Sequence, residues 1–500
     1  MKNVNDSMNR TVDFSKWNSL GFYNYYYSKI GSEIKLYDSF ENALDSYKLK
    51  TIDPVAIIEI IAKGYCFGDR TLIKNIHRTP WMARPNIDNT KWDYFTLPAH
   101  ECHVADVVEI ANRLADLLKN EIVEICRKRH HIGILLSGGM DSRITAGMMY
   151  GLARDGKISE KVTAITWGVE NSRDVVYSKE IARRYGWQWE HVNMTNENLL
   201  ENIGVAEEIG CEVSPVHLHA IPEVRQIQGL DCIIASSFGD SVGRGVFSSR
   251  HITQLKSIAL YVRNWFYLVK GKAFKQLFPM AINDLSSYRN YFRREKECHY
   301  MEIEQEAHYM RRMLNPCIGL INSHIPTAQT FTSAEVYGYM WSLPREVRTD
   351  NIYAVIMEKY IKELNDIPWS KTGIQFAGDT GAPDHYLKNY HHYHKWINQD
   401  LFDQLIGEID IDTLDRIGIF NNRALMNALF TNRKIDTEKL TRIDGLFVWL
   451  SSVIRMMRKR GISGTDLSIS NDLLDGLKAR LSGAYIYLVE NCINLGKNLR

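Results

Sequence analysis

The sequence predicts an α/β protein with a doubly wound, mostly parallel sheet, a small β-rich unit before it and a helical part after it. Between about residues 130 and 240, short apolar runs alternate with amphipathic helical segments, and strands that alternate with helices form parallel sheets. From about residue 252 onward the apolar spacing is mainly that of helices, which predicts the helical C-terminal part.

The elements follow from the pattern in chain order. The aromatic, alternating stretch LGFYNYYYSKIGSEIKLYDSF is typical of a hairpin that turns at Gly31. The segment 105–129 has helical apolar spacing and ends in three basic residues, which suits a helix C-terminus. Beyond it we expect four strands separated by helices, and the strands fall within 131–136, 161–169, 189–194 and 232–238.

The length of the chain predicts more than one domain. A chain of 500 residues is too long for one hydrophobic core. We place one boundary after residue 104, so that residues 1–104 form the β-rich unit and residues 105–500 contain the sheet and the helical part.

Composition and charge limit the classes of partner. The net charge is +2, which gives no indication of nucleic-acid or membrane binding. The first residues lack the apolar run of a signal peptide, and we find no uncharged apolar run of about 18 residues. Eight cysteines without a CxxC pair fit a reducing compartment. We therefore expect a cytoplasmic protein that binds neither nucleic acid nor membrane.

One motif indicates chemistry: Ser137-Gly138-Gly139-Met140-Asp141-Ser142, between a predicted strand and a predicted helix. Glycines let a backbone approach a phosphate closely, and a helix start offers N–H groups and partial positive charge to an anion. A carboxylate beside phosphates needs a cation, so Asp141 indicates a Mg²⁺ ligand. An isolated Ser-Gly-Gly is more often a tight turn, but this longer pattern favours a nucleotide site.

The stretch ILLSGGMDSR resembles the pyrophosphate-binding loop of the class B asparagine synthetases, whose relatives include β-lactam synthetases and lasso-peptide cyclases. Later stretches also resemble this family, among them TWG, CIIASSFGDSVGRG, SLPREVR and IPWSKTGI. The resemblance covers most of residues 20–375. It implies a sheet of the ATP-pyrophosphatase type, which is also called adenine nucleotide α-hydrolase-like.

The resemblance also implies the site residues. Asp141 and Asp240 match the family's acidic Mg²⁺ ligands, and Lys371 matches its catalytic lysine. ATP and Mg²⁺ are the implied substrate and cofactor. The implied ATP- and pyrophosphate-binding residues are Leu135, Ser137, Gly138, Gly139, Asp141, Ser142, Thr166, Gly168, Ser236 and Ser237.

Two departures from the family change the expected reaction. The family's glutaminase uses an N-terminal cysteine, whereas here Met1 is followed by Lys2 and the first cysteine is Cys66. We therefore expect residues 1–104 to be a truncated, inactive glutaminase-like domain. In the later loop, Phe238 or Ser237 on one side of Asp240 and Ser241 on the other stand where the family has acidic residues, which argues against asparagine as the product.

The resemblance then implies ATP-dependent amide-bond formation through an acyl-adenylate, with release of AMP and pyrophosphate and without glutamine hydrolysis. The expected partners are a small-molecule or peptide carboxylate and an amine donor; a homodimer or a pathway partner stays open. The alternatives are an intramolecular cyclase, another ATP-pyrophosphatase enzyme such as a tRNA-modifying thiolase or an argininosuccinate-type ligase, and a catalytically silent homologue.

A histidine-rich segment, 385–394, allows two interpretations. Four histidines could indicate a metal site. We favour a polar, aromatic loop over the active site, or a surface helix, because the segment lacks cysteines and paired carboxylates at ligand spacing.

Overall fold

A computed structural model describes residues 25–376, 385–467, 469–470 and 473–498. Its centre is a parallel five-stranded sheet in the order β12-β9-β6-β7-β8. The bounds are Ile132–Leu135 for β6, Val162–Gly168 for β7, Gln188–Asn193 for β8, Cys232–Ala235 for β9 and Thr327–Gln329 for β12. The predicted mixed α/β fold with a parallel sheet is confirmed. The edge strand β12 lies in a region that the sequence predicted to be helical.

The strand order contains a topological switch point. From β6 the chain moves outward to β7 and β8, and it then returns to place β9 and β12 on the other side of β6. In such sheets the loops after the two central strands diverge, and ligands bind in the crevice at their carboxyl ends. Here these loops follow β6 and β9, which are hydrogen-bonded neighbours.

Both faces of the sheet are buried, as expected for a doubly wound fold. Ile132 and Ile134 of β6 belong to one core, and Leu135 of the same strand belongs to the other. The first core also contains residues of α3, α4, α5 and α13, whose bounds are Val107–Cys126, Met140–Arg154, Arg173–Tyr185 and Asp350–Tyr360. The second contains residues of α6 and α7, Asn196–Glu208 and Ile221–Val224.

The described residues before α3 form two small antiparallel sheets and two helices. The predicted hairpin is confirmed: β1 pairs with β2, and Gly31 at the turn has a φ of +63°, which glycine adopts without strain. The strand bounds are Tyr26–Ile30 for β1, Glu33–Tyr37 for β2, His77–Arg78 for β3, Ala83–Pro85 for β4 and Trp92–Tyr94 for β5; α1 spans Phe40–Asp45 and α2 spans Pro54–Lys63.

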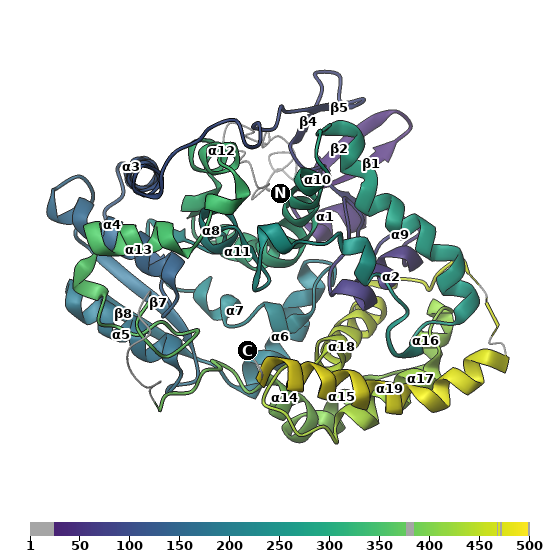
Figure 1. Ribbon diagram of the computed structural model, residues 1–500. Coiled ribbons are helices and arrows are strands. Elements are labelled where there is room, and N and C mark those ends of the chain that lie inside the picture. Colours follow the sequence, from purple (N-terminus) through teal and green to yellow (C-terminus); the bar gives the residue numbers. More distant parts are fainter. Residues whose placement is uncertain (1–24, 377–384, 468, 471–472, 499–500) are drawn as a thin grey trace, which may run out of the picture.

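The remaining elements are mainly helical, which confirms the predicted helical C-terminal part. The helices are α8 Gly239–Arg244, α9 Gly271–Tyr291, α10 Glu297–Glu304, a π-helical continuation Gln305–Leu314, α11 Asn315–Asn322, α12 Ala334–Ser342, α14 Tyr393–Lys395, α15 Phe402–Glu408, α16 Ile411–Ile417, α17 Asn422–Asn432, α18 Arg442–Arg460 and α19 Leu473–Asn498; the short strands β10 Val246–Phe247 and β11 Arg250–His251 pair with each other. Figure 1 shows the sheet at one side of the molecule and α15–α19 at the other.

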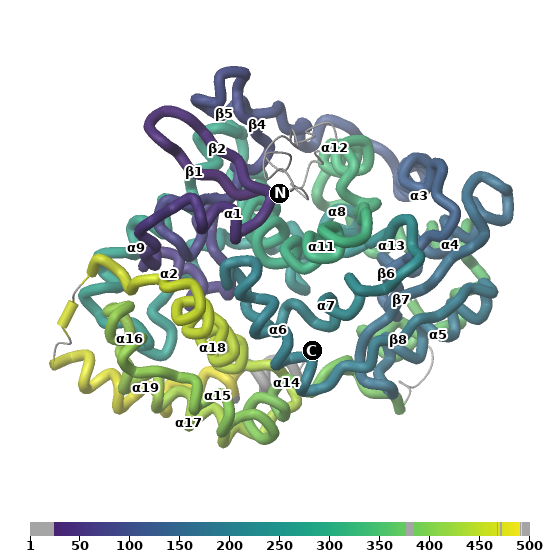
Figure 2. The backbone as a smooth tube through the Cα atoms, turned by 180° about the vertical axis from the view of Figure 1, so that it is seen from behind, coloured from purple at the N-terminus to yellow at the C-terminus, as the bar shows by residue number. Residues whose placement is uncertain are grey.

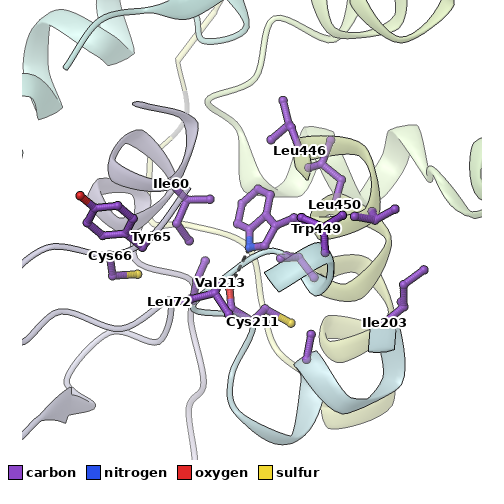
Figure 3. Packing of buried hydrophobic residues seen from close by; sticks show 14 of the residues in the cluster. Ile60, Tyr65, Cys66, Leu72, Ile203, Cys211, Val213, Leu446, Trp449 and Leu450 are labelled. Atoms are coloured by element: carbon purple, nitrogen blue, oxygen red, sulfur yellow. Dashed lines mark hydrogen bonds between the residues drawn. The ribbon is translucent and has the colours of Figure 1, made fainter. Parts of the chain in front are cut away.

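The N-terminal part and the C-terminal helices share one core. Figure 2 shows α2 beside α18, and the guanidinium of Arg442 donates to the carbonyl of Ala62 at the end of α2. In Figure 3, Ile60 lies beside Trp449 of α18, whose indole donates to the carbonyl of Cys211 at 2.7 Å. Residues on both sides of the predicted boundary at residue 104 therefore stabilise each other, and the boundary itself stays a prediction.

A fully buried carboxylate joins four segments of the C-terminal helices. Asp444 accepts hydrogen bonds from Asn398 at 2.7 Å and Asn432 at 2.6 Å, and from the backbone N–H of Thr441 at 2.7 Å. It also lies 2.9 Å from Nδ1 of His394. Burial alone would lower the pKa of His394, but the hydrogen bond and charge of Asp444 outweigh it, so that this pKa is raised.

We expect Asp444→Ala to destabilise the protein by about 3–5 kcal/mol, because it leaves buried donors unpaired. Thermal unfolding, with the exposed Asp436→Ala as a control, measures this. Since the pKa of His394 is raised, the charged pair contributes fully below about pH 6.5 and less as the pH rises through the raised value. Asp444→Asn should therefore destabilise more at low than at high pH; equal losses would contradict a charged pair.

In the part of the chain that the structure describes, no helix is long and apolar enough to cross a membrane.

Candidate active site

The loop Ser137–Gly139 connects β6 to α4 at the switch point. Its conformation is set by its own hydroxyl groups: Ser142 Oγ accepts from the N–H of Ser137 and lies 3.1 Å from Ser137 Oγ, which accepts from the N–H of Gly139 at 3.1 Å. Gly139 is the N-cap of α4 and offers no side-chain cap. The N-terminus of α4 therefore keeps N–H groups available for an anion.

Close packing explains why Gly138 is a glycine. A Cβ at this position would lie 2.8 Å from Cβ of Ser370 and 2.9 Å from Cδ2 of Tyr177. Its N–H donates to Oδ1 of Asp174, in the first turn of α5, at 3.0 Å. The loop is thus enclosed between α5 and the segment that contains Ser370.

The structure brings the two predicted metal ligands together. Asp141 lies in the first turn of α4 and Asp240 in the first turn of α8, which follows β9. A Cβ on Gly239 would lie only 2.6 Å from Cβ of Asp141. The side chain of Asp141 therefore packs against the start of α8, beside Asp240.

The electrostatics of this carboxylate pair fit a divalent cation. Burial raises the pKa of Asp141, and burial together with the charge of Asp141 raises the pKa of Asp240 to about 7. Oδ1 of Asp141 is buried and has no hydrogen-bond partner among the described residues. A cation between the two carboxylates would relieve both the repulsion and the unpaired oxygen.

Lys371 also lies at this loop, although it is far away in the sequence. The N–H of the preceding residue, Ser370, donates to the carbonyl of Gly138 at 3.1 Å. Lys371 itself is exposed, and its Nζ lies 5.0 Å from the ring centroid of Trp369. The segment that carries Lys371 is thus joined to the loop, and the loop leads into the helix that carries Asp141.

Arg143 holds the segment before Lys371 against the loop. This fully buried side chain, on the first turns of α4, donates to the carbonyls of Ile367 at 2.7 Å, Pro368 at 2.8 Å and Gly138 at 3.3 Å. One guanidinium therefore links the loop to the segment that carries Lys371.

We expect Arg143→Met to lower any turnover by about 100-fold, because it lets the Lys371 segment shift relative to the loop. Steady-state rates would measure this loss, and protease sensitivity around residues 364–371 would measure the shift. Arg154→Met, at the exposed end of α4, is the matched control. Unchanged rates and protease sensitivity would mean that Arg143 does not position this segment.

The other predicted nucleotide-binding residues lie around the same strand ends. Leu135 is the last residue of β6, and its side chain belongs to the core. The hydroxyl of Thr166 donates to the carbonyl of Leu136 at 2.8 Å and is buried beneath the loop. Gly168 ends β7 with a φ of +143°. Ser236 is buried and donates to Thr145, whereas Ser237 is exposed at the end of β9. Only Ser237 therefore presents its side chain to solvent.

The histidine-rich segment runs beside the end of β7. The carbonyl of Tyr390 accepts from the N–H of Val169 at 3.0 Å, and Leu387 pairs with Ser172 in a parallel bridge. His394 points instead to Asp444. No group of three or more potential ligands placed to hold a metal ion occurs among the described residues. The segment therefore contacts the end of β7 and the N-cap of α5, and its role stays a prediction.

The region of the chain that contains the loop is similar to known proteins. Residues 113–223 match the family model for asparagine synthase. This region is asparagine synthase-like. The asparagine synthetase [glutamine-hydrolyzing] of Gallus gallus is 27% identical over 104 residues, which are 21% of this chain and 18% of the chicken protein. The chain thus matches about a fifth of the length of that relative.

The asparagine synthase-like region contains the loop and Asp141, but it ends before Asp240 and Lys371. It also contains two residues that the sequence analysis missed, Arg143 and Asp174. An arginine or aspartate in an amphipathic helix is usually a solvated side chain, so no local signal marks these two as contacts of the loop. Arg244, near Asp141, was missed for the same reason.

Proposed function

We propose that the protein activates a carboxylate with ATP, as an acyl-adenylate, and joins the acyl group to an amine. The observation that carries this proposal is the convergence of the Ser137–Ser142 loop, Asp141, Asp240 and Lys371 at the switch point of a parallel sheet. The asparagine synthase-like region supports ATP-dependent amide ligase activity in general. The ATP-pyrophosphatase type of the sheet belongs to the same proposal.

Each residue has a task in this reaction. The N-terminus of α4 and the hydroxyls of Ser137 and Ser142 would bind the β- and γ-phosphates. Asp141 and Asp240 would hold Mg²⁺, which neutralises charge on the phosphate oxygens when bound. The exposed ammonium of Lys371 would stabilise the negative charge that develops at the α-phosphate and at the acyl group. Most of the catalysis would then come from positioning and charge.

The reaction has two displacements. A carboxylate oxygen attacks the α-phosphorus, the bond from this phosphorus to the oxygen bridging to the β-phosphate breaks, and pyrophosphate leaves. The nitrogen of the amine then attacks the acyl carbon, the bond from this carbon to the AMP oxygen breaks, and the nitrogen loses a proton. The products are an amide, AMP and pyrophosphate.

The buried position of Cys66 supports an amine source other than glutamine. Cys66, the first cysteine in the sequence, is fully buried, and burial raises the pKa of its thiol. A buried thiol with a raised pKa is a poor nucleophile. We therefore propose ammonia, an external amine or an amine of the same substrate as the acceptor of the acyl group.

Incubation with MgATP, a panel of carboxylic acids that includes aspartate, and ammonia would test the proposal, with products followed by ³¹P NMR. AMP and pyrophosphate that depend on one acid would support it, and their formation without any added amine would favour an intramolecular cyclase. ADP and phosphate as products would contradict an acyl-adenylate. If the wild-type protein does not bind MgATP, the chain is a silent homologue.

A further inference from the structure

Arg244 is a buried guanidinium beside the predicted metal ligands. It lies four residues after Asp240 in α8, so both side chains share one face of that helix. Its side chain is 6% exposed, and Nη1 donates to Oδ1 of Asp350 at 2.6 Å. Its Nε is buried, has no hydrogen-bond partner among the described residues and lies 3.7 Å from Oδ1 of Asp141. That distance is too long for a hydrogen bond.

Arg244 and Lys371 both lie close to the ring of Trp369. Cζ of Arg244 lies 5.4 Å from the ring centroid of Tyr353 and 5.6 Å from that of Trp369. Nζ of Lys371 lies 5.0 Å from the same Trp369 centroid. Two cations thus lie within about 6 Å of the centroid of one indole ring. The residue after this tryptophan, Ser370, is hydrogen-bonded to the loop that begins at Ser137. An anion bound beside Trp369 would be attracted by both positive charges.

The free edge of Arg244 has the geometry of an oxyanion site. With Nη1 fixed by Asp350, the guanidinium can offer Nε and Nη2, which form a planar pair of donors that matches two oxygens of a phosphate. A buried N–H without an acceptor is costly, and a bound oxyanion would remove that cost. We propose that Arg244 binds the phosphate oxygens of ATP that leave as pyrophosphate. This inference rests on the proposed function and adds a second cation to Lys371.

A purely structural role for Arg244 makes a different prediction. As a counter-ion of Asp141, it would act only through that carboxylate, and any cation of similar length would serve. As a ligand of phosphate, it needs its planar pair of donors and acts even when Asp141 carries no charge. The lysine variant and the Asp141→Asn background therefore separate the two roles.

The test is calorimetric titration of the full chain with inorganic pyrophosphate in the presence of Mg²⁺. We expect Arg244→Gln to bind about 10- to 100-fold more weakly than the wild type, because it loses a charge-assisted, bidentate contact. Arg244→Lys should recover only part of the affinity. Arg184→Gln is the control, because Arg184 pairs with the carboxylates of Glu180 and Asp366 at the surface. This variant should bind pyrophosphate as tightly as the wild type.

A second comparison uses Asp141→Asn with and without Arg244→Gln, titrated with pyrophosphate free of Mg²⁺. A loss of affinity caused by Arg244→Gln in this background supports direct contact, whereas no further loss means that Arg244 acts through Asp141 and overturns the inference. Full recovery by Arg244→Lys would also overturn it. If Arg244→Gln binds pyrophosphate as tightly as the wild type, the inference is overturned and the proposed function stays intact. If the wild-type protein binds neither MgATP nor pyrophosphate, the inference and the proposed function are both overturned.

Discussion

Replacing Lys371 by alanine is expected to lower the rate of AMP formation by about 100- to 1,000-fold, while the affinity for MgATP changes far less. A cation that faces charge developing in the transition state contributes mainly to the rate, and removal of such a group in other enzymes has effects of this size. Lys371 is exposed and follows the segment that Arg143 fixes, so its removal should leave the fold intact. Single-turnover formation of AMP, together with ATP titration, measures the two quantities separately.

Two further variants make this result specific. Lys371→Arg keeps the charge and should retain more activity than the alanine variant, although its bulkier head must fit beside Trp369. Lys362→Ala removes another exposed lysine nearby in the sequence and should have the wild-type rate. If Lys371→Ala loses ATP affinity as strongly as it loses rate, the lysine binds the ground state, and its assignment to the transition state is wrong.

The parts of the fold that the sequence predicted are those with a local signal. The strands β6, β7 and β9 are short apolar runs and lie within their predicted ranges, whereas β8 starts at Gln188, one residue before its predicted range. The hairpin at Gly31 was marked by alternation and a glycine. In contrast, β12 has only three residues, and it is a strand because it pairs with β9, which lies more than 90 residues earlier in the chain. A strand of three residues is too short to show an alternating pattern, and the sequence around it does not indicate a partner so far away in the chain.

The same limit applies to the candidate site. The Ser137–Ser142 loop is contiguous, so its residue types and spacing were enough to predict phosphate binding. Asp240 and Lys371 came only from the resemblance to a family, since a lone aspartate or lysine in a loop has no distinctive pattern. Arg143 acts on carbonyls more than 220 residues later in the chain, and nothing in the sequence near it indicates those partners.

The shared core of the N-terminal part has a similar explanation. The apolar face of α2 predicts burial, but it does not say against what. In the structure α2 packs against α9, and its last turn accepts a hydrogen bond from Arg442 of α18. Thus a segment that resembles a truncated domain by its length contributes packing to the C-terminal helices, and we expect it to be needed for stability whether or not it has any activity of its own.

The paired carboxylates lead to the second large effect: Asp141→Asn and Asp240→Asn should each lower the rate of AMP formation by about 100-fold or more, and both should raise the Mg²⁺ concentration needed for half-maximal rate. Each change removes one negative charge from a pair that a dication would bridge. The two aspartates lie close together in the structure, because Asp141 packs against Gly239, the residue before Asp240. Mg²⁺ titrations of turnover measure the effect, and the exposed Asp155→Asn is the control.

The double variant decides whether the two aspartates act on one ion. If they do, Asp141→Asn and Asp240→Asn together should cost little more than either alone, because the first change already removes the metal site and leaves the second nothing to remove. Effects that multiply would indicate two independent roles. In that case Asp240 would act away from the ion, and the carboxyl ends of β6 and β9 would contribute separately to catalysis. A single ion instead requires both strand ends, which explains why the site lies where the order of the sheet reverses.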